Sequence, residues 1–276
     1  MAAHGARIRF VEAGAGPALL FVHDALASQE TYREAIAHLA RSFRVIAPDL
    51  PGFGHSEKPD PVRYAYGYNA FADSLLDLVA ALDFGRLHVC GHGMGGGVAL
   101  ALAARHPSIV HKLVLASALV YPGGEHPLDR AARLPLTGAL FWRQIMGWSM
   151  FRNYLHGTVY AGAREVPLDR VNTAYANFNA PAARRAAHAT IAAKSDTRML
   201  VAHLPRIQAE SLVVWGRDDR LAPVEQGRRL ARALRARFEV IACGRCPPDE
   251  APEAFASIVT SFLRTAPAAA RNGPVS

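Results

Sequence analysis

Residues Leu87–Gly96 read Leu-His-Val-Cys-Gly-His-Gly-Met-Gly-Gly. A short apolar run, typical of a buried strand, leads into a glycine-rich turn and then into an alanine-rich helical segment. Small residues are needed at such a turn, because the chain reverses sharply and the following helix must pack close to the strand. The stretch therefore indicates a strand, a sharp turn and a helix.

The rest of the chain repeats this alternation of short β-rich runs and longer helical patterns. Such a pattern favours βαβ units, which build a mostly parallel sheet covered by helices on both faces. We expect strands at Arg7–Ala13, Ala18–His23, Arg44–Ala47, Leu87–Cys90, Lys112–Ala116, Ser211–Trp215 and Phe238–Ala242. We expect helices at Thr31–Arg41, Tyr68–Leu82, Met94–Arg105, Val224–Ala236 and Pro252–Arg264.

Residues 120–205 break the alternation. They show no convincing strand, several segments of helical length and an aromatic-rich run, Leu140–Tyr154. We interpret them as a helical cap inserted into one discontinuous α/β core made of residues 1–119 and 206–265. Residues 266–276 are alanine, proline, glycine and polar residues, and we expect a disordered tail there.

Composition limits the class of protein. With 276 residues, 51% of them hydrophobic, the chain can bury a full core. Three cysteines do not suggest a disulfide framework, no secretion signal precedes Arg7, and no run reaches the ~18–20 apolar residues of a membrane span. We therefore expect a cytoplasmic protein without a membrane partner. The net charge of +8 comes from scattered arginines, so we expect no nucleic-acid partner.

The glycine-rich turn resembles the G-x-S-x-G nucleophile elbow of the α/β-hydrolase family. Pro48–Ser56 is similar to the loop after the family's fourth strand, and Trp215–Asp219 resembles the turn that supplies the acid of the catalytic triad. The resemblance covers nearly the whole chain except the cap, and is closest to the capped branch that includes epoxide hydrolases and haloperoxidases. It implies the α/β-hydrolase fold and gives Asp219 the role of the triad acid.

Two triad positions carry the wrong residues. Gly93 stands where the family has its serine, and Arg245, in the segment Gly244–Glu253, stands where the family has its histidine. Arginine cannot act as a general base near neutral pH, because its guanidinium stays protonated. Loss of the serine or the histidine costs a serine protease about 10⁶-fold in turnover. We therefore do not expect hydrolysis through the family's serine mechanism.

The oxyanion side of the site also departs from the family. The pair His23-Asp24 replaces the usual His-Gly, and a carboxylate there would repel developing negative charge unless it points away or is protonated. Asp24 is our candidate general base, because a carboxylate near an apolar cap can abstract a proton from a substrate. The alternative is a loop residue that caps a helix or pairs with a cation.

We also include Asp219, Arg245 and His92 among the candidate catalytic residues. Asp219 and Arg245 should lie side by side, either as an ion pair that joins two loops or with Arg245 as a clamp for a substrate carboxylate. His92 can transfer protons or simply pack beneath the turn. The predicted substrate contacts are His23, Ala25, Gly93, Met94, Trp142 and Trp148.

Cys243 and Cys246 have the spacing of a redox or metal half-site, but no second cysteine pair completes a zinc site, so we expect neither a metal nor a cofactor. From the sequence we expect a non-hydrolytic enzyme, a lyase, cyclase or isomerase, acting on a small apolar or peptide-like metabolite in a biosynthetic pathway. The alternatives are a non-catalytic ligand-binding protein and a hydrolase with a non-standard nucleophile. A homodimer is compatible with the sequence.

Overall fold

The computed structural model describes every residue except 1, 4, 123–125, 135, 164 and 266–276, so the tail expected at 266–276 lies outside the described residues. Within the described residues, a seven-stranded sheet has the order β3-β5-β4-β6-β7-β8-β9. In this sheet, as far as the structure describes the chain, β3 pairs antiparallel to its neighbour and the other strands pair parallel. The strands are β3 (Phe10–Ala13), β4 (Ala18–Val22), β5 (Arg44–Pro48), β6 (Leu87–His92), β7 (Val110–Ala116), β8 (Glu210–Gly216) and β9 (Arg237–Ile241).

The prediction of one strand over Arg7–Ala13 is wrong in its extent. The chain forms a short β2 (Ala6–Arg7), paired with β1 (Ala2–Ala3), and enters the main sheet only at Phe10. Between these strands, the carbonyls of Arg7 and Arg9 accept hydrogen bonds from the N–H groups of Glu57 and Asp49, each at 2.9 Å. The backbone there pairs with the loop after β5 instead of with a strand.

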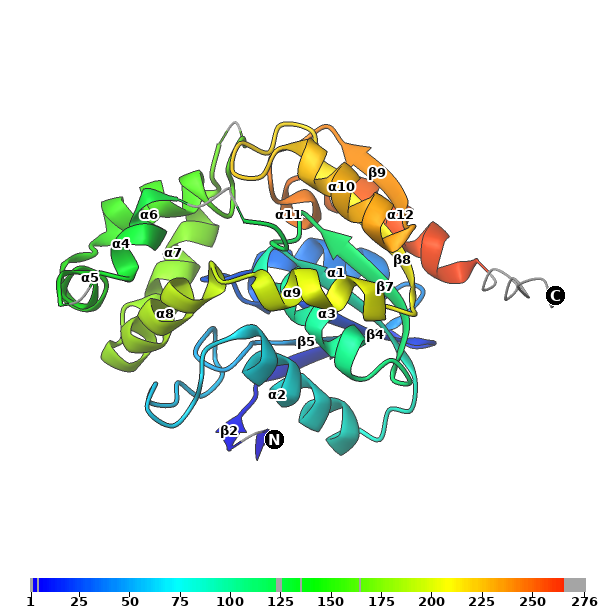
Figure 1. The fold of residues 1–276 in the computed structure, drawn as a ribbon, viewed down its shortest axis with the longest axis horizontal. Coiled ribbons are helices and arrows are strands. Elements are labelled where there is room, and N and C mark those ends of the chain that lie inside the picture. The colour runs from blue at the N-terminus through cyan, green and yellow to red at the C-terminus, as the bar shows by residue number, and fades with distance from the viewer. Residues whose placement is uncertain (1, 4, 123–125, 135, 164, 266–276) are drawn as a thin grey trace.

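Helices cover both faces of the sheet (Figure 1). On one face α1 (Arg33–Leu39) packs against α12 (Pro252–Arg264), and on the other α2 (Tyr68–Ala81) packs against α3 (Met94–Arg105). The predicted helix over Thr31–Arg41 starts as a 3-10 turn, η1 (Gln29–Tyr32). The remaining core helices are α10 (Val224–Leu234) and the short α11 (Pro247–Glu250).

In the described part of residues 120–205, all regular elements are helical. Figure 1 shows most of them as a separate layer beside the core. They are α4 (Pro127–Ala132), α5 (Thr137–Leu140), the π-helical turn η2 (Phe141–Ile145), α6 (Trp148–Gly157), α7 (Leu168–Phe178), α8 (Pro181–Lys194), α9 (Arg198–His203) and η3 (Leu204–Arg206). The last two, α9 and η3, already pack against α3 of the core.

A salt bridge joins the cap to the core. Arg170 on α7 donates to Asp249 on α11 and to Glu34 on α1, each at 3.1 Å. The side chains of Arg170 and Asp249 are 8% and 3% exposed, and the Tyr160 hydroxyl also donates to Asp249. Among the residues that the structure describes, no helix is both long and apolar enough to cross a bilayer.

Candidate active site

The backbone of the elbow keeps a sharp turn without a side chain at its apex. Gly93 joins β6 to α3 with φ +56° and ψ −119°, a conformation that a residue with a side chain rarely adopts. The Gly93 N–H donates to the carbonyl of Ala116 at 3.0 Å, and its own carbonyl accepts from Leu119 at 2.9 Å. These two bonds fix the turn against the end of β7.

The Asp24 carboxylate lies at the elbow. Its Oδ1 accepts hydrogen bonds from the N–H groups of Ala25 at 2.8 Å and of Met94 at 2.7 Å. Met94 directly follows the elbow apex, and Ala25 lies on the loop after β4, so these are the two N–H groups that the resemblance gives to an oxyanion hole. A Cβ at Gly93 would overlap the Asp24 carboxylate. Asp24 therefore fills both the oxyanion hole and the space of the missing serine side chain.

Asp24 is 4% exposed, yet its surroundings favour the ionised carboxylate. Burial raises the pKa of Asp24, but electrostatic attraction to His92, Arg245 and Lys194 and the hydrogen bond from Met94 together hold it below its ordinary value of 3.8. His92 contributes only when it is protonated. At neutral pH the stabilising charges are therefore those of Arg245 and Lys194.

Arg245 and Asp219 form a completely buried ion pair. The Nη1 of Arg245 lies 3.0 Å from the Oδ2 of Asp219, and both side chains are 0% exposed. Asp219 Oδ1 accepts from the N–H groups of Leu221 and Ala222, each at 2.9 Å. The contact expected from the resemblance is present. The Nε and Nη2 of Arg245 have no hydrogen-bond partner among the described residues.

Two buried histidines flank the carboxylate, and each uses both ring nitrogens. His92 lies 2.9 Å from the Tyr32 hydroxyl and 2.9 Å from the carbonyl of Arg245. His23 lies 2.7 Å from the carbonyl of Asp24 and accepts from the N–H of Leu50 at 2.8 Å. Burial lowers the pKa of His92 to about 4. Both nitrogens of His92 therefore already have a partner, and this geometry does not support the predicted proton transfer by His92. The rings of His92 and His23 hold the surrounding loops in place.

The prediction that Trp142 and Trp148 contact the substrate is not supported by their positions. Trp142 is 0% exposed and packs edge-on against Tyr154 and Phe178 inside the cap. Trp148 donates its indole N–H to Asn172 at 2.9 Å, within the same layer. Helical spacing of aromatics in the cap serves internal packing here. The other predicted site residues, His23, Asp24, Ala25, His92, Gly93, Met94, Asp219 and Arg245, come together at the elbow.

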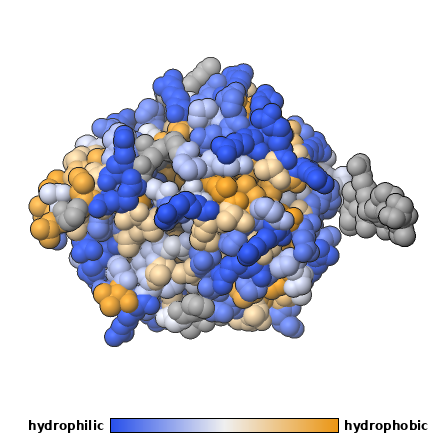
Figure 2. Space-filling model, in the orientation of Figure 1, coloured by the Kyte–Doolittle hydropathy of each residue, from blue (hydrophilic) through white to orange (hydrophobic). Residues whose placement is uncertain are grey.

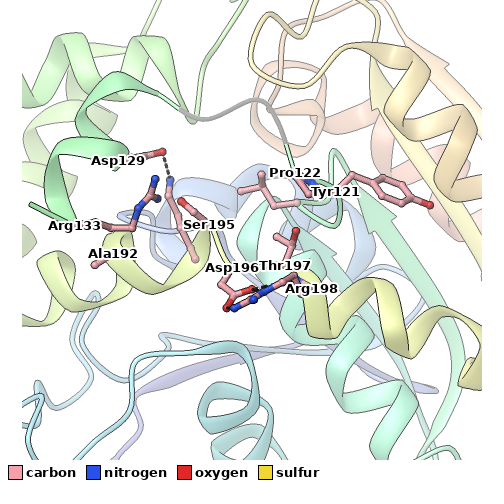
Figure 3. A pocket seen from close by; sticks show the side chains of 11 residues that line it. Tyr121, Pro122, Asp129, Arg133, Ala192, Ser195, Asp196, Thr197 and Arg198 are labelled. Carbon is pink, nitrogen blue, oxygen red and sulfur yellow. Dashed lines mark hydrogen bonds and ion pairs between the residues drawn. The ribbon is translucent and has the colours of Figure 1, made fainter.

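A cavity of about 390 Å³ lies between the cap and the core, and Figure 3 shows its walls. Leu119, whose N–H binds the elbow carbonyl, lines it on the core side. On the cap side are Asp129 and Lys194, an ion pair at 3.1 Å whose side chains are 2% and 7% exposed. Because Leu119 is hydrogen-bonded to Gly93, the cavity begins next to the elbow, although Asp24 itself does not line it.

Sequence reasoning missed Lys194, Asp129 and the Arg170–Asp249 salt bridge. No motif marks them, since each pair joins elements that are distant in the sequence. In the described residues no group of three or more His, Cys, Asp or Glu side chains could hold a metal ion. Cys243 and Cys246 are buried free thiols.

The sheet order, the elbow and the inserted cap define an α/β-hydrolase. The family model for the alpha/beta hydrolase fold matches residues 17–252, and the chain belongs to this family.

Individual relatives give the comparison more detail. The chain is 32% identical over 281 residues to an uncharacterized protein of Mycobacterium tuberculosis, covering 95% of this chain and 80% of that one. It is 30% identical over 283 residues to the 2-hydroxymuconate semialdehyde hydrolase of Pseudomonas sp. CF600, covering 97% and 94%. A hydrolase structure from Pseudomonas aeruginosa PA01 matches with a TM-score of 0.80 and 26% identity, covering 95% and 96%.

These relatives correct the predicted activity. The 2-hydroxymuconate semialdehyde hydrolase and the Pseudomonas aeruginosa protein are enzymes, and both are hydrolases. The prediction of a lyase, cyclase or isomerase is therefore wrong. A missing serine does not by itself mean the loss of hydrolysis, because the structure places another acidic group, the Asp24 carboxylate, in the serine's space.

Proposed function

We propose that the protein is a hydrolase in which the Asp24 carboxylate takes the place of the nucleophilic serine. The observation that carries the proposal is the pair of hydrogen bonds from Ala25 and Met94 to Oδ1. They hold one oxygen of an ionised carboxylate, while no described residue donates a hydrogen bond to Oδ2. One oxygen is thus anchored and the other is available to react.

The occupied oxyanion hole favours one kind of substrate. A carbonyl substrate would need the N–H groups of Ala25 and Met94 for its own oxyanion, but Asp24 already uses both. Displacement at a saturated carbon creates no oxyanion on the substrate at that position. We therefore propose an apolar substrate with a leaving group on a saturated carbon, bound in the cavity beside Leu119 and Lys194.

The proposed reaction has two steps. Oδ2 of Asp24 forms a bond to the substrate carbon while the bond to the leaving group breaks, and the leaving group departs with the electron pair. Water then adds to Cγ of the resulting ester, and the oxyanion that develops on Oδ1 already lies between the N–H groups of Ala25 and Met94. Collapse releases the alcohol and restores the carboxylate. The sum consumes one water and releases the protonated leaving group.

The second step lacks a histidine base. Arg245 stays protonated, because electrostatic attraction to Asp219 and Asp24 outweighs burial and raises its pKa. General base catalysis is typically worth about 10²–10⁴-fold. We therefore expect the ester on Asp24 to form faster than it breaks down and to accumulate.

A second candidate reaction rests on the relatives. The 2-hydroxymuconate semialdehyde hydrolase is named for a carbonyl compound, and Asp24 could instead activate water for attack on a carbonyl carbon. This mechanism requires Asp24 Oδ1 to leave the N–H groups of Ala25 and Met94, so that the substrate oxygen can take them.

Isotope labelling separates the two reactions. The protein is incubated in H₂¹⁸O with a panel of haloalkanes, epoxides, nitrophenyl esters and 2-hydroxymuconate semialdehyde. Mass spectrometry then measures the mass of the intact protein and the ¹⁸O content of the product. A carboxylate nucleophile gives a covalent adduct on Asp24 and unlabelled oxygen in the product of the first turnover. A base mechanism gives labelled product at once and no adduct.

Variants complete the test. Asp24→Asn should abolish turnover and adduct, while Asp73→Asn, which removes a carboxylate paired with Arg105 on the surface of α2, should leave both intact. Turnover that survives Asp24→Asn would disprove the proposal.

A further inference from the structure

Exposed apolar side chains concentrate in one segment of the cap. Among the described residues, eight large hydrophobic side chains are exposed, and five of them fall between residues 134 and 150. They are Leu134, Leu136, Leu140, Ile145 and Met150, which we call the cap patch. Figure 2 shows apolar surface at the outer end of the cap, over α5. Scattered single hydrophobics are ordinary, whereas a cluster marks an interaction surface.

Leu136 is held in solvent at a conformational cost. Its side chain is 86% exposed, and its backbone has φ +58° and ψ −56°. This conformation is rare and strained for a residue with a side chain. Neither feature helps an isolated protein, so the pair indicates that the leucine is positioned for contact with something outside the chain.

Basic residues outnumber acidic residues in the sequence that carries the cap patch. In the sequence from 126 to 157 there are four arginines, Arg130, Arg133, Arg143 and Arg152, and one acidic residue, Asp129. The Asp129 side chain is 2% exposed and paired with Lys194, so it does not offset the arginines at the surface. The cap patch therefore combines exposed apolar side chains with nearby positive charge.

We propose that the cap patch docks on the surface of an anionic lipid bilayer, an interaction beyond the proposed hydrolase activity. Apolar side chains enter the boundary between headgroups and acyl chains, and the arginines face the lipid phosphates. A second copy of the chain fits the charges worse, because a twofold contact would place arginines against arginines. Docking of this kind needs no membrane-spanning helix, and it differs from the sequence-based expectation of no membrane partner.

The patch adjoins the cavity. Arg133 belongs to the four arginines and also lines the cavity between cap and core. Docking on a bilayer would therefore bring one wall of the cavity close to the lipid surface. An apolar substrate dissolved in the bilayer could then reach the cavity without crossing bulk water.

Vesicle flotation tests the proposal with the full chain. We expect binding to phosphatidylcholine vesicles that contain phosphatidylglycerol, weaker binding in high salt, and no binding to phosphatidylcholine alone. Leu136→Gly with Leu140→Ser should weaken binding about tenfold or more. Arg152→Gln, at an exposed arginine of α6, should weaken it about fivefold. Leu136→Gly also relieves the backbone strain, so loss of binding would not reflect poor folding.

The matched control is Val62→Ser, which removes a 94% exposed apolar side chain outside the patch and should leave vesicle binding unchanged. Equal binding by the wild type and the Leu136→Gly, Leu140→Ser variant would overturn the proposal. So would a dimer in light scattering that the same variant dissociates, because the patch would then serve self-association. Neither outcome depends on hydrolase activity, so the two proposals fail separately.

Discussion

The carboxylate of Asp24 and the hydrogen atom of Gly93 share one space at the elbow. A Cβ at Gly93 would collide with the Asp24 carboxylate, which is itself fixed by the N–H groups of Ala25 and Met94. The two positions are therefore coupled, and the consequences can be measured.

Gly93→Ser alone should destabilise the protein by about 1–3 kcal/mol, because the new side chain is forced into occupied space. In an Asp24→Gly background the same change should cost markedly less, so the double-mutant cycle should show a coupling free energy. Urea unfolding of the four proteins gives the values. Gly147→Ser, at a glycine with open space around its Cβ position, is the control and should be near neutral. If the effects of Gly93→Ser and Asp24→Gly on stability are additive, the two side chains do not compete for the same space.

Restoring the family's residues should create an esterase. The triple change Asp24→Gly, Gly93→Ser and Arg245→His empties the oxyanion hole and places a hydroxyl and an imidazole beside Asp219, whose Oδ2 now holds Arg245. Hydrolysis of a nitrophenyl ester should rise above the wild-type level, and Asp219→Asn in the triple variant should reduce it by about 10⁴-fold. An inactive triple variant that is folded would show that the cap no longer admits an ester.

Arg245→Met should destabilise the protein by about 3–5 kcal/mol at neutral pH, because it leaves the buried Asp219 charge without its cation. Burial already raises the pKa of Asp219. A raised folded-state pKa means that stability from this group is present at low pH and is lost as pH rises through that pKa. The loss in free energy of unfolding caused by Arg245→Met should therefore be smaller at acid pH than at neutral pH.

Urea unfolding at neutral and acid pH checks this prediction. Arg217→Met is the control: its pair with Asp218 is exposed on both sides, at 64% and 48%, and should be worth at most about 1 kcal/mol. If the loss of stability in Arg245→Met does not change with pH, it comes from altered packing and not from the Asp219 charge.

Arg170→Met should loosen the cap more than the core. The change removes the hydrogen bonds to Asp249 and Glu34, and we expect a loss of about 1.5–3 kcal/mol. Hydrogen exchange should accelerate in α7 and α8, while β6 and β7 stay protected. Arg33→Met removes an exposed pair with Asp169 and should leave exchange unchanged. Uniform acceleration would mean that cap and core unfold together.

Much of this architecture could be predicted from the sequence. The elbow at Gly93 is marked by its glycines and by the strand and helix around it, and the missing serine and histidine are visible because Gly93 and Arg245 occupy family positions. The contact between Asp219 and Arg245 followed from the same alignment of segments. Local patterns are enough where the chemistry depends on neighbours in sequence or on a shared motif.

The remaining features depend on side-chain directions and long-range packing. The sequence shows that Asp24 replaces a glycine, but not that its carboxylate turns into the oxyanion hole, a direction made possible by the space at Gly93 on another strand. The pairs Lys194–Asp129 and Arg170–Asp249 arise from helix packing that no spacing reveals. The aromatic run around Trp142 has a helical periodicity that is the same for pocket lining and for internal packing, so the sequence alone does not distinguish the two.

The mutual exclusion at the elbow also restricts the history of this lineage. The carboxylate at position 24 can turn into the oxyanion hole only when the apex carries no side chain, so we expect the two positions to change together. A genome survey for proteins of the same kind should accordingly look for the two-residue signature, Asp after the histidine of β4 together with Gly at the apex. A copy that carries the apical glycine alone lacks the carboxylate that fills this space.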